Sequence, residues 1–347
     1  MGIRTVSVSN RADIYECFPD VVLSRRGRLV VAYRESDSHV AADFSHIAWR
    51  TSDDFGRTWS PPRYVVCSER RNGTLWKWNC PRLSRLSDGR LALVCDLYPQ
   101  PPGERYGERA PVVHWWVSYD DAENWEGPIP TAAEGIVPDK LLELSDGSWL
   151  LAAHRGFPPE WRLVQRAWRS LDQGRTWLGP FTVADRSGLN LCEASIIQAP
   201  GGTLVAYMRE NSGRGWPIFK AFSNDLGQTW DGVYATLMDG GHRPTAGLLP
   251  SGQVLTTYRY YPGPGIRNLN TFACLEPLDS ALERDRTLQR ASILPLDHDR
   301  SPHADSGYTG WAALPDGEIF IVNYVVDDAT VAQIRGYWIT EGMFCLG

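Results

Sequence analysis

The chain has 347 residues, of which 43% are hydrophobic and 22% are charged, and its formal net charge is −6. This composition is typical of a folded globular protein and excludes extended disorder. An acidic chain also disfavours a broad nucleic-acid-binding surface, although it leaves room for a local basic pocket.

Targeting and cofactor signals are sparse along the chain. No run of about 18 apolar residues predicts a transmembrane helix, so we expect no membrane association. The N-terminal stretch 1–20 has no apolar segment of the signal-peptide type, which favours a cytoplasmic protein, or a secreted one if a leader has been removed. The seven cysteines include no CxxC pair, the seven histidines are scattered, and no Gly-rich phosphate or dinucleotide motif occurs. We therefore expect no metal ion and no cofactor.

One phrase recurs six times, and it consists of apolar alternation, a Gly turn and a second apolar run. The copies are 17–33, 79–95, 136–153, 191–208, 242–258 and 307–324. Their turn glycines are Gly27, Gly89, Gly147, Gly202, Gly252 and Gly317. Each copy predicts a β-hairpin, because two period-two runs flank a tight turn.

A second phrase, Ser-x-Asp-x-Gly-x-Thr-Trp, follows the hairpin in several units. It occurs at 52–59, 170–177 and 223–230, and a degenerate copy at 118–125 has Ala for Gly and Asn for Thr. The Asp carboxylate can accept backbone N–H groups across a turn, and the Trp ring can pack between sheets. We therefore expect Asp54, Asp172 and Asp225 to be structural rather than catalytic.

The two phrases keep a constant phase, which predicts the architecture. Length alone suggests about two domains. Six units of about 58 residues, each with room for four strands, instead predict an all-β, six-bladed β-propeller with four-stranded antiparallel blades. We expect a single domain over residues 1–347, closed by pairing of the segment 4–10 with the last blade.

The second phrase is the Asp-box, and four Asp-boxes in phase with six hairpins resemble the sialidase (neuraminidase) superfamily over about residues 10–340. The resemblance implies a glycan or glycoconjugate substrate and a site on the central axis. In this family the first strand of each unit is innermost, so residues beside those strands are the candidates.

Glu193 and Tyr308 begin the innermost strands of units four and six. In similar sialidases a Tyr at this point is the nucleophile and a Glu takes its proton. A neutral phenol suits a sugar with a carboxylate on its anomeric carbon, because an anionic nucleophile would be repelled. The resemblance also implies Asp37, in the loop after the second strand of unit one, as the acid/base. Three further residues are alternatives for that role: Asp20, Asp139 and His39.

The family also implies three arginines that clamp the carboxylate of the sugar. Arg209 and Arg267 match two of them. The third belongs in a Phe/Tyr-Arg-Ile-Pro phrase, which here reads Glu-Cys-Phe-Pro, so that Cys17 stands where Arg is expected. Three other arginines near the inner strands could substitute for it: Arg34, Arg82 and Arg243. With these arginines the pocket would be basic although the chain is acidic.

Three functions remain open from the sequence. The first is an exo-acting retaining glycoside hydrolase that releases a terminal sialic acid or a related acidic sugar. The second, favoured by Cys17, is a hydrolase or lyase of the same fold that acts on a uronic-acid or rhamnose-containing glycan through His39, Tyr308 or the carboxylates. The third is a propeller that binds glycans or proteins without catalysis, since fold alone does not determine function.

Overall fold

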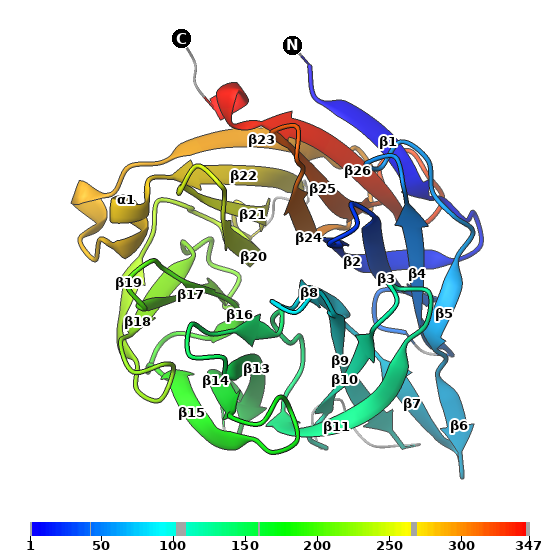
Figure 1. The fold of residues 1–347 in the computed structure, drawn as a ribbon, viewed down its shortest axis with the longest axis horizontal. Helices are drawn as coiled ribbons and strands as arrows, with labels where there is room; N and C mark the ends of the chain where they lie inside the picture. Colours follow the sequence, from blue (N-terminus) through cyan, green and yellow to red (C-terminus); the bar gives the residue numbers. More distant parts are fainter. Residues whose placement is uncertain (1, 42, 102–108, 159, 265–268, 345–347) are drawn as a thin grey trace.

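Six antiparallel sheets surround a central axis in the computed structural model, which describes residues 2–41, 43–101, 109–158, 160–264 and 269–344 (Figure 1). Each sheet is one blade, and its innermost strand comes first in the hairpin repeat. The prediction of an all-β, six-bladed propeller with four-stranded antiparallel blades is confirmed.

The first three blades come from the N-terminal half of the chain. Blade 1 consists of β2 (Tyr15–Leu23), β3 (Leu29–Ser36), β4 (Ser45–Ser52) and β5 (Arg63–Val66). Blade 2 consists of β8 (Arg82–Arg85), β9 (Leu91–Gln100), β10 (Val112–Ser118) and β11 (Glu126–Glu134), and it is extended by β7 (Thr74–Trp78) and β6 (Glu69–Arg71). Blade 3 consists of β12 (Leu142–Glu143), β13 (Trp149–Phe157), β14 (Arg162–Ser170) and β15 (Leu178–Ala184).

The C-terminal half supplies the other three blades. Blade 4 consists of β16 (Leu191–Gln198), β17 (Leu204–Glu210), β18 (Phe219–Ser223) and β19 (Asp231–Ala235). Blade 5 consists of β20 (Gly241–Leu248), β21 (Val254–Tyr260), β22 (Asn270–Glu276) and β23 (Ser292–His298). Blade 6 consists of β24 (Ser306–Ala313), β25 (Glu318–Val325), β26 (Gln333–Thr340) and β1 (Arg4–Ser9).

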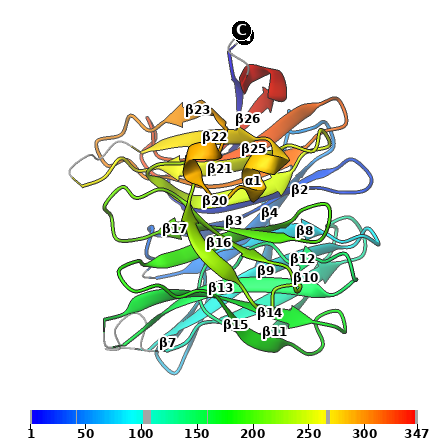
Figure 2. The same cartoon turned by 90° about the vertical axis from the view of Figure 1, so that its left-hand side faces the viewer.

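The ring is closed by strands from opposite ends of the chain. β1 pairs antiparallel with β26, with Arg4 opposite Trp338, so the predicted closure by the segment 4–10 is confirmed. Blade 5 has no Asp-box, and in its place are the short helix α1 (Leu278–Leu282) and the 3-10 turn η1 (Arg286–Leu288). α1 lies at the outer edge of the ring in Figure 1 and faces the viewer in Figure 2. A second 3-10 turn, η2 (Glu341–Phe344), follows β26. Across the described residues, no helix is long and apolar enough to cross a membrane.

Local chemistry explains why the hairpins and the core form. All six turn glycines have φ between 81° and 96°, a region that other residues rarely adopt. The buried apolar side chains form six clusters, each between two neighbouring blades; one, between blades 1 and 2, contains Trp49, Trp78 and Trp116. The many Trp residues therefore serve largely to pack one blade against the next.

The Asp-boxes are turns between the third and fourth strands of a blade. Asp54 Oδ1 accepts the Thr58 N–H at 2.9 Å and the Ser52 hydroxyl at 2.7 Å, while Oδ2 accepts the Thr58 hydroxyl at 2.7 Å. In the degenerate copy the Asn124 side-chain amide donates to Asp120 Oδ2 at 2.8 Å and replaces the Thr hydroxyl. These carboxylates hold turns, as expected.

Substitution Asp54→Ala is expected to lower the free energy of unfolding by about 1–2 kcal/mol, because three hydrogen bonds to one partly exposed carboxylate are lost. Urea denaturation measures this change. Turnover by the folded fraction should equal that of the wild type, and a large loss of turnover without a loss of stability would contradict the structural role.

Candidate active site

One residue at or just before the inner strand of each blade lies toward the axis. In five blades this residue has positive φ, between 50° and 59°: Phe18, Val137, Glu193, Arg243 and Tyr308. In four of these five blades the pairing register shifts at this point. Such bulges turn a side chain out of the regular alternation and are common beside functional sites. In blade 2 the equivalent residue is Cys80, which is followed by Pro81.

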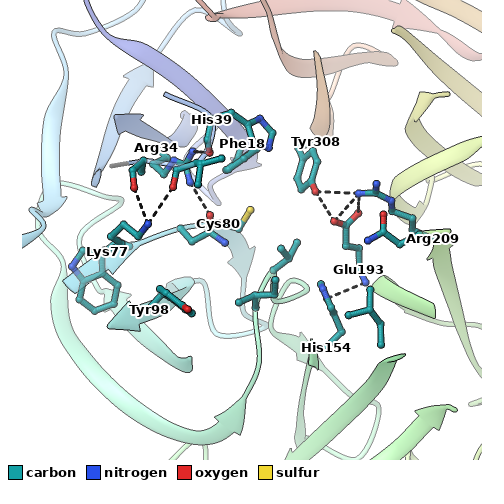
Figure 3. Close-up of a pocket in the computed structure, with 18 residues that line it drawn as sticks. Phe18, Arg34, His39, Lys77, Cys80, Tyr98, His154, Glu193, Arg209 and Tyr308 are labelled. Carbon is teal, nitrogen blue, oxygen red and sulfur yellow. Dashed lines mark hydrogen bonds and ion pairs between the residues drawn. The ribbon is translucent and has the colours of Figure 1, made fainter. Parts of the chain in front are cut away.

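Five of these six residues line one cavity of about 440 Å³, here called the axial cavity (Figure 3). Its wall consists of Phe18, Arg34, His39, Val40, Ala41, Lys77, Trp78, Asn79, Cys80, Tyr98, Ile136, Val137, His154, Leu163, Glu193, Arg209, Asn211 and Tyr308. The size suits a small organic ligand such as a monosaccharide.

Tyr308 and Glu193 are in direct contact inside the axial cavity. The Tyr308 hydroxyl donates to Glu193 Oε1 at 2.5 Å. Arg209 Nη1 lies 3.0 and 3.1 Å from the two Glu193 oxygens and 3.5 Å from Tyr308 Oη. The structure thus brings together three residues that the sequence placed in one site, and they come from blades 6 and 4.

The electrostatics define the protonation state of this cluster. Burial alone would raise the pKa of Glu193, but Arg209, His154, Arg243 and the Tyr308 hydroxyl together lower it to about 2. Burial and the neighbouring Glu193 raise the pKa of Tyr308 well above its usual value. The resting pair is therefore a neutral phenol that donates to a carboxylate.

His154 supports the carboxylate from blade 3. Its Nδ1 accepts the backbone N–H of Glu193 at 3.2 Å. Burial lowers the pKa of His154 to about 4, so the ring is neutral near neutral pH. Because Nδ1 accepts, the proton of the neutral ring is on Nε2.

Two further arginines flank the Tyr308 ring. The guanidinium carbons of Arg243 and Arg259 lie 5.6 and 5.4 Å from its centroid. Arg243 Nη2 donates to Pro138 O at 3.1 Å, and Arg259 Nη1 donates to Ser306 O at 3.3 Å. Positive charge at this distance lowers the energetic cost of negative charge on Tyr308 Oη when its proton leaves.

Arg259 was not identified as a site residue from the sequence, although its spacing from the turn glycine marks it. The residue seven positions after each turn glycine occupies an equivalent place on the second strand of its blade. These residues are Arg34, Asp96, His154, Arg209, Arg259 and Tyr324. Register shows the equivalence, since Arg34 is opposite Cys17, Arg209 opposite Cys192 and Arg259 opposite His242. The predicted blade 5 arginine, Arg267, lies outside the described residues.

Arg34 occupies the wall near the position of the missing family arginine. It pairs with Cys17 across β2 and β3 and lines the axial cavity. Its Nη1 donates to Asn79 Oδ1 at 2.8 Å, and its Nη2 donates to the carbonyls of Ser38 and His39. Arg34 therefore places a positive charge at the cavity, but much of its donor capacity is used within the protein.

Two predicted residues, Asp37 and Arg82, are not among the wall residues of the axial cavity. Asp37 is exposed and accepts from Ser38 Oγ and from the Asp43 N–H, both at 3.1 Å, and its charge acts on Lys77 of the wall. Arg82 is buried on the axis, where it donates to Thr309 O and Thr245 Oγ1 at 3.1 Å.

The remaining axial carboxylates belong to the same buried region. Asp20 Oδ2 lies 3.5 Å from Arg82 Nε, and its Oδ1 lies 3.1 Å from Lys140 Nζ. Asp139 Oδ2 accepts the Ile196 N–H at 2.6 Å. Asp20, Asp139 and Arg82 do not line the axial cavity. Among the described residues, the arginines of its wall are Arg34 and Arg209. Nowhere in the described ranges do three His, Cys, Asp or Glu side chains group as they would around a metal ion.

The lowered pKa of Glu193 predicts a contribution to acid stability. Its folded pKa, about 2, lies below the ordinary value of 4.5, so the unfolded chain binds this proton more tightly. The stabilisation is present above pH 4.5 and is lost as pH falls toward about 2. Urea denaturation across that range should show a steeper loss for the wild type than for Glu193→Gln; parallel curves would contradict the ion pair.

Comparisons with known proteins agree with this fold. The family model described as BNR repeat-like domain matches residues 27–259. No curated protein matches the sequence. Among solved structures, a protein of unknown function from Dyadobacter fermentans superposes with a TM-score of 0.76 at 21% identity, covering 97% of this chain and 98% of that chain.

Two sialidases superpose as well. A Hadza microbial sialidase superposes with a TM-score of 0.72 at 18% identity, and the match covers 98% of this chain and 69% of the sialidase chain. The Trypanosoma rangeli sialidase, solved with 2,3-difluorosialic acid as a covalent intermediate, gives 0.68 at 13% identity, covering 99% of this chain and 59% of its own. At these identities the likeness is one of fold. The chain belongs to the BNR repeat-like domain family, and it has the six-bladed propeller fold of the sialidases.

Proposed function

We propose that the protein is an exo-acting retaining glycoside hydrolase, with Tyr308 as nucleophile, that releases a terminal sialic acid or a related acidic sugar. The observation that carries the proposal is the 2.5 Å hydrogen bond from Tyr308 Oη to Glu193 inside the axial cavity. A buried phenol that donates to a carboxylate is prepared for proton transfer as it attacks an electrophilic carbon.

The first chemical step uses this pair. Tyr308 Oη bonds to the anomeric carbon while its proton passes to Glu193 and the glycosidic bond breaks. Arg209, Arg243 and Arg259 surround the pair with positive charge, which stabilises the negative charge that passes between the two oxygens. In the second step water attacks the same carbon while the bond from that carbon to Tyr308 Oη breaks. Tyr308 regains its proton from Glu193, and the proton released by the water balances the one that the leaving glycosidic oxygen takes up.

The charge of the cavity supports an acidic substrate. Arg34 and Lys77 lie on one side of the axial cavity and Arg209 on the other, whereas Glu193 is the one carboxylate among its described wall residues (Figure 3). A basic cavity attracts an anionic ligand. Because the chain as a whole has a net charge of −6, the rest of its surface competes little for that ligand. The Trypanosoma rangeli sialidase binds a sialic acid analogue on the same fold.

A second candidate function follows from the hydrogen bonds that Arg34 makes within the protein. Cys17 replaces the first arginine that the family resemblance implies, and Arg34 donates to Asn79 and to loop carbonyls. A weaker carboxylate clamp favours a substrate with a different anionic geometry. The alternative is therefore a hydrolase or lyase of the same fold that acts on a uronic-acid or rhamnose-containing glycan.

Fluorogenic glycosides separate the two candidates. The wild type and Tyr308→Phe are assayed on a sialoside, a glucuronide, a rhamnoside and a galactoside. Cleavage of the sialoside by the wild type and its loss in Tyr308→Phe support the first proposal. Cleavage restricted to the glucuronide or rhamnoside would reject sialic acid as the substrate and favour the second candidate.

A further inference from the structure

A histidine–carboxylate pair stands at the mouth of the axial cavity. His39 lines the cavity and its Nδ1 lies 2.6 Å from Asp305 Oδ2. Asp305 also accepts the hydroxyls of Tyr15 and Tyr324, the latter at 2.8 Å. Burial opposes ionisation of Asp305, but His39 and Tyr15 outweigh it and lower its pKa. A carboxylate at Nδ1 keeps a proton on that nitrogen and leaves Nε2 to meet a substrate.

The loop that carries His39 is held by two buried cations. The four consecutive carbonyl groups of residues 38–41 all accept from them. Arg34 Nη2 donates to the first two, at 3.3 Å from Ser38 O, and Lys77 Nζ donates to the last two, at 3.2 and 2.7 Å. Arg34 and Lys77 are 3% and 5% exposed, so these bonds are shielded from water. The loop backbone is thereby fixed although the His39 side chain is 45% exposed.

Phe18 connects this pair to the nucleophile. Its ring packs edge-on against His39 with centroids 5.2 Å apart and in a tilted orientation against Tyr308 with centroids 4.7 Å apart. His39 and Tyr308 thus contact the same Phe18 ring, and all three residues line the axial cavity. In contrast, Asp37 is not among the residues that line the cavity, and it accepts from Asp43 N–H and Ser38 Oγ within its own loop.

We propose that His39, oriented by Asp305, is the general acid and base of the reaction, in the role that the family resemblance gave to Asp37. The inference rests on the proposed glycosidase function and names a further catalytic residue for it. Arg34 and Lys77 are positioning residues, since they act through the loop backbone and not on the reacting atoms.

The proton balance is complete with these groups. In the first step the His39 imidazolium donates its Nε2 proton to the glycosidic oxygen as that oxygen leaves the anomeric carbon, and Tyr308 Oη forms the new bond while its own proton passes to Glu193. In the second step neutral His39 Nε2 takes a proton from the attacking water, while the bond from carbon to Tyr308 Oη breaks and Tyr308 takes its proton back from Glu193. The net reaction adds one water to the glycoside, and His39 returns to its initial state.

Leaving-group dependence tests the role of His39. The wild type and His39→Gln are compared on two glycosides of the sugar that the wild type cleaves, one with a 4-nitrophenol leaving group and one with a second sugar. A nitrophenolate departs without protonation, whereas a sugar alkoxide does not. We expect His39→Gln to lose at least about 100-fold in kcat/KM on the disaccharide and less than about 10-fold on the nitrophenyl glycoside. Azide, which needs no base, should raise turnover of the nitrophenyl glycoside by the variant.

Three variants complete the experiment. His303→Gln, which changes an exposed histidine in the loop before β24, should behave as the wild type on both substrates. Asp305→Asn should show the same selective loss as His39→Gln, because Asp305 acts by orienting His39. If Asp305 were only structural, its substitution would reduce turnover of both substrates equally. Tyr308→Phe should lose both substrates together.

The outcomes separate the two proposals. Equal losses on the two substrates in His39→Gln, or no loss, would overturn the role of His39 while Tyr308→Phe still tests the nucleophile. Retained turnover in Tyr308→Phe would overturn the proposed function. Absence of turnover by the wild type on all glycosides would overturn both.

Discussion

Tyr308→Phe is expected to lower kcat/KM by at least about 100-fold for any glycoside that the protein cleaves. The substitution removes the attacking oxygen and the proton that passes to Glu193. The Phe ring retains the same ring position between Arg243 and Arg259, so the fold should persist. Steady-state kinetics on the best fluorogenic substrate measures the loss, and the melting temperature verifies folding.

Tyr234→Phe is the matched control for this experiment. Tyr234 lies on β19, the outermost strand of blade 4, and its hydroxyl is 3.4 Å from Asp231. Its loss should leave kcat/KM unchanged. If Tyr308→Phe kept near wild-type turnover, another group would have to be the nucleophile, and the assignment of the axial cavity as a tyrosine-dependent site would be wrong.

Glu193→Gln is expected to have the second largest effect, again about 100-fold or more in kcat/KM. An amide oxygen still accepts the Tyr308 hydroxyl but is a poor base, so the phenol must attack with its proton in place. The Arg209 guanidinium also loses the two carboxylate contacts at 3.0 and 3.1 Å and keeps an unpaired, buried charge. The melting temperature should therefore fall as well.

The two effects should not add. Because Glu193 acts through the Tyr308 proton, the double variant Tyr308→Phe/Glu193→Gln should be about as active as Tyr308→Phe alone. Kinetics on the four proteins of this cycle measure the coupling. Additive losses would show that Glu193 acts on the substrate independently of Tyr308.

The propeller could be predicted from the sequence because its signals are local. Gly27 and its five equivalents require positive φ at hairpin turns, and Asp54 and its equivalents close their turns through groups within a few residues. Such local signals recur once in each blade, so the number of regularly spaced copies gives the number of blades. Pairing of β1 with β26 follows from closing the ring, since an unpaired edge would be exposed.

The site was predictable only in part, because only some of its side chains lie at positions that the strand repeat defines. Glu193 and Tyr308 lie on inner-strand bulges, and the resemblance located them by strand. Arg259 was encoded in the constant spacing from the turn glycines but was hidden among several arginines of blade 5.

Loop and axial geometry were beyond sequence reasoning for a different reason. The direction of Asp37 and His39 depends on two cations from distant positions, Arg34 and Lys77, that hold the intervening carbonyls. The burial of Arg82 with Asp20 depends on how six strands meet at the axis. Neither contact has a local signal in the sequence.

Trapping of a glycosyl-enzyme tests the central claim most directly. The protein is incubated with 2,3-difluorosialic acid, or with the fluorinated analogue of whichever sugar the wild type releases, then digested and analysed by mass spectrometry. A fluorine near the anomeric carbon slows the second step and lets the covalent intermediate accumulate. The mechanism predicts an adduct on the peptide that contains Tyr308, and none in Tyr308→Phe. An adduct on another residue, or an unmodified protein that still turns over the parent glycoside, would contradict it.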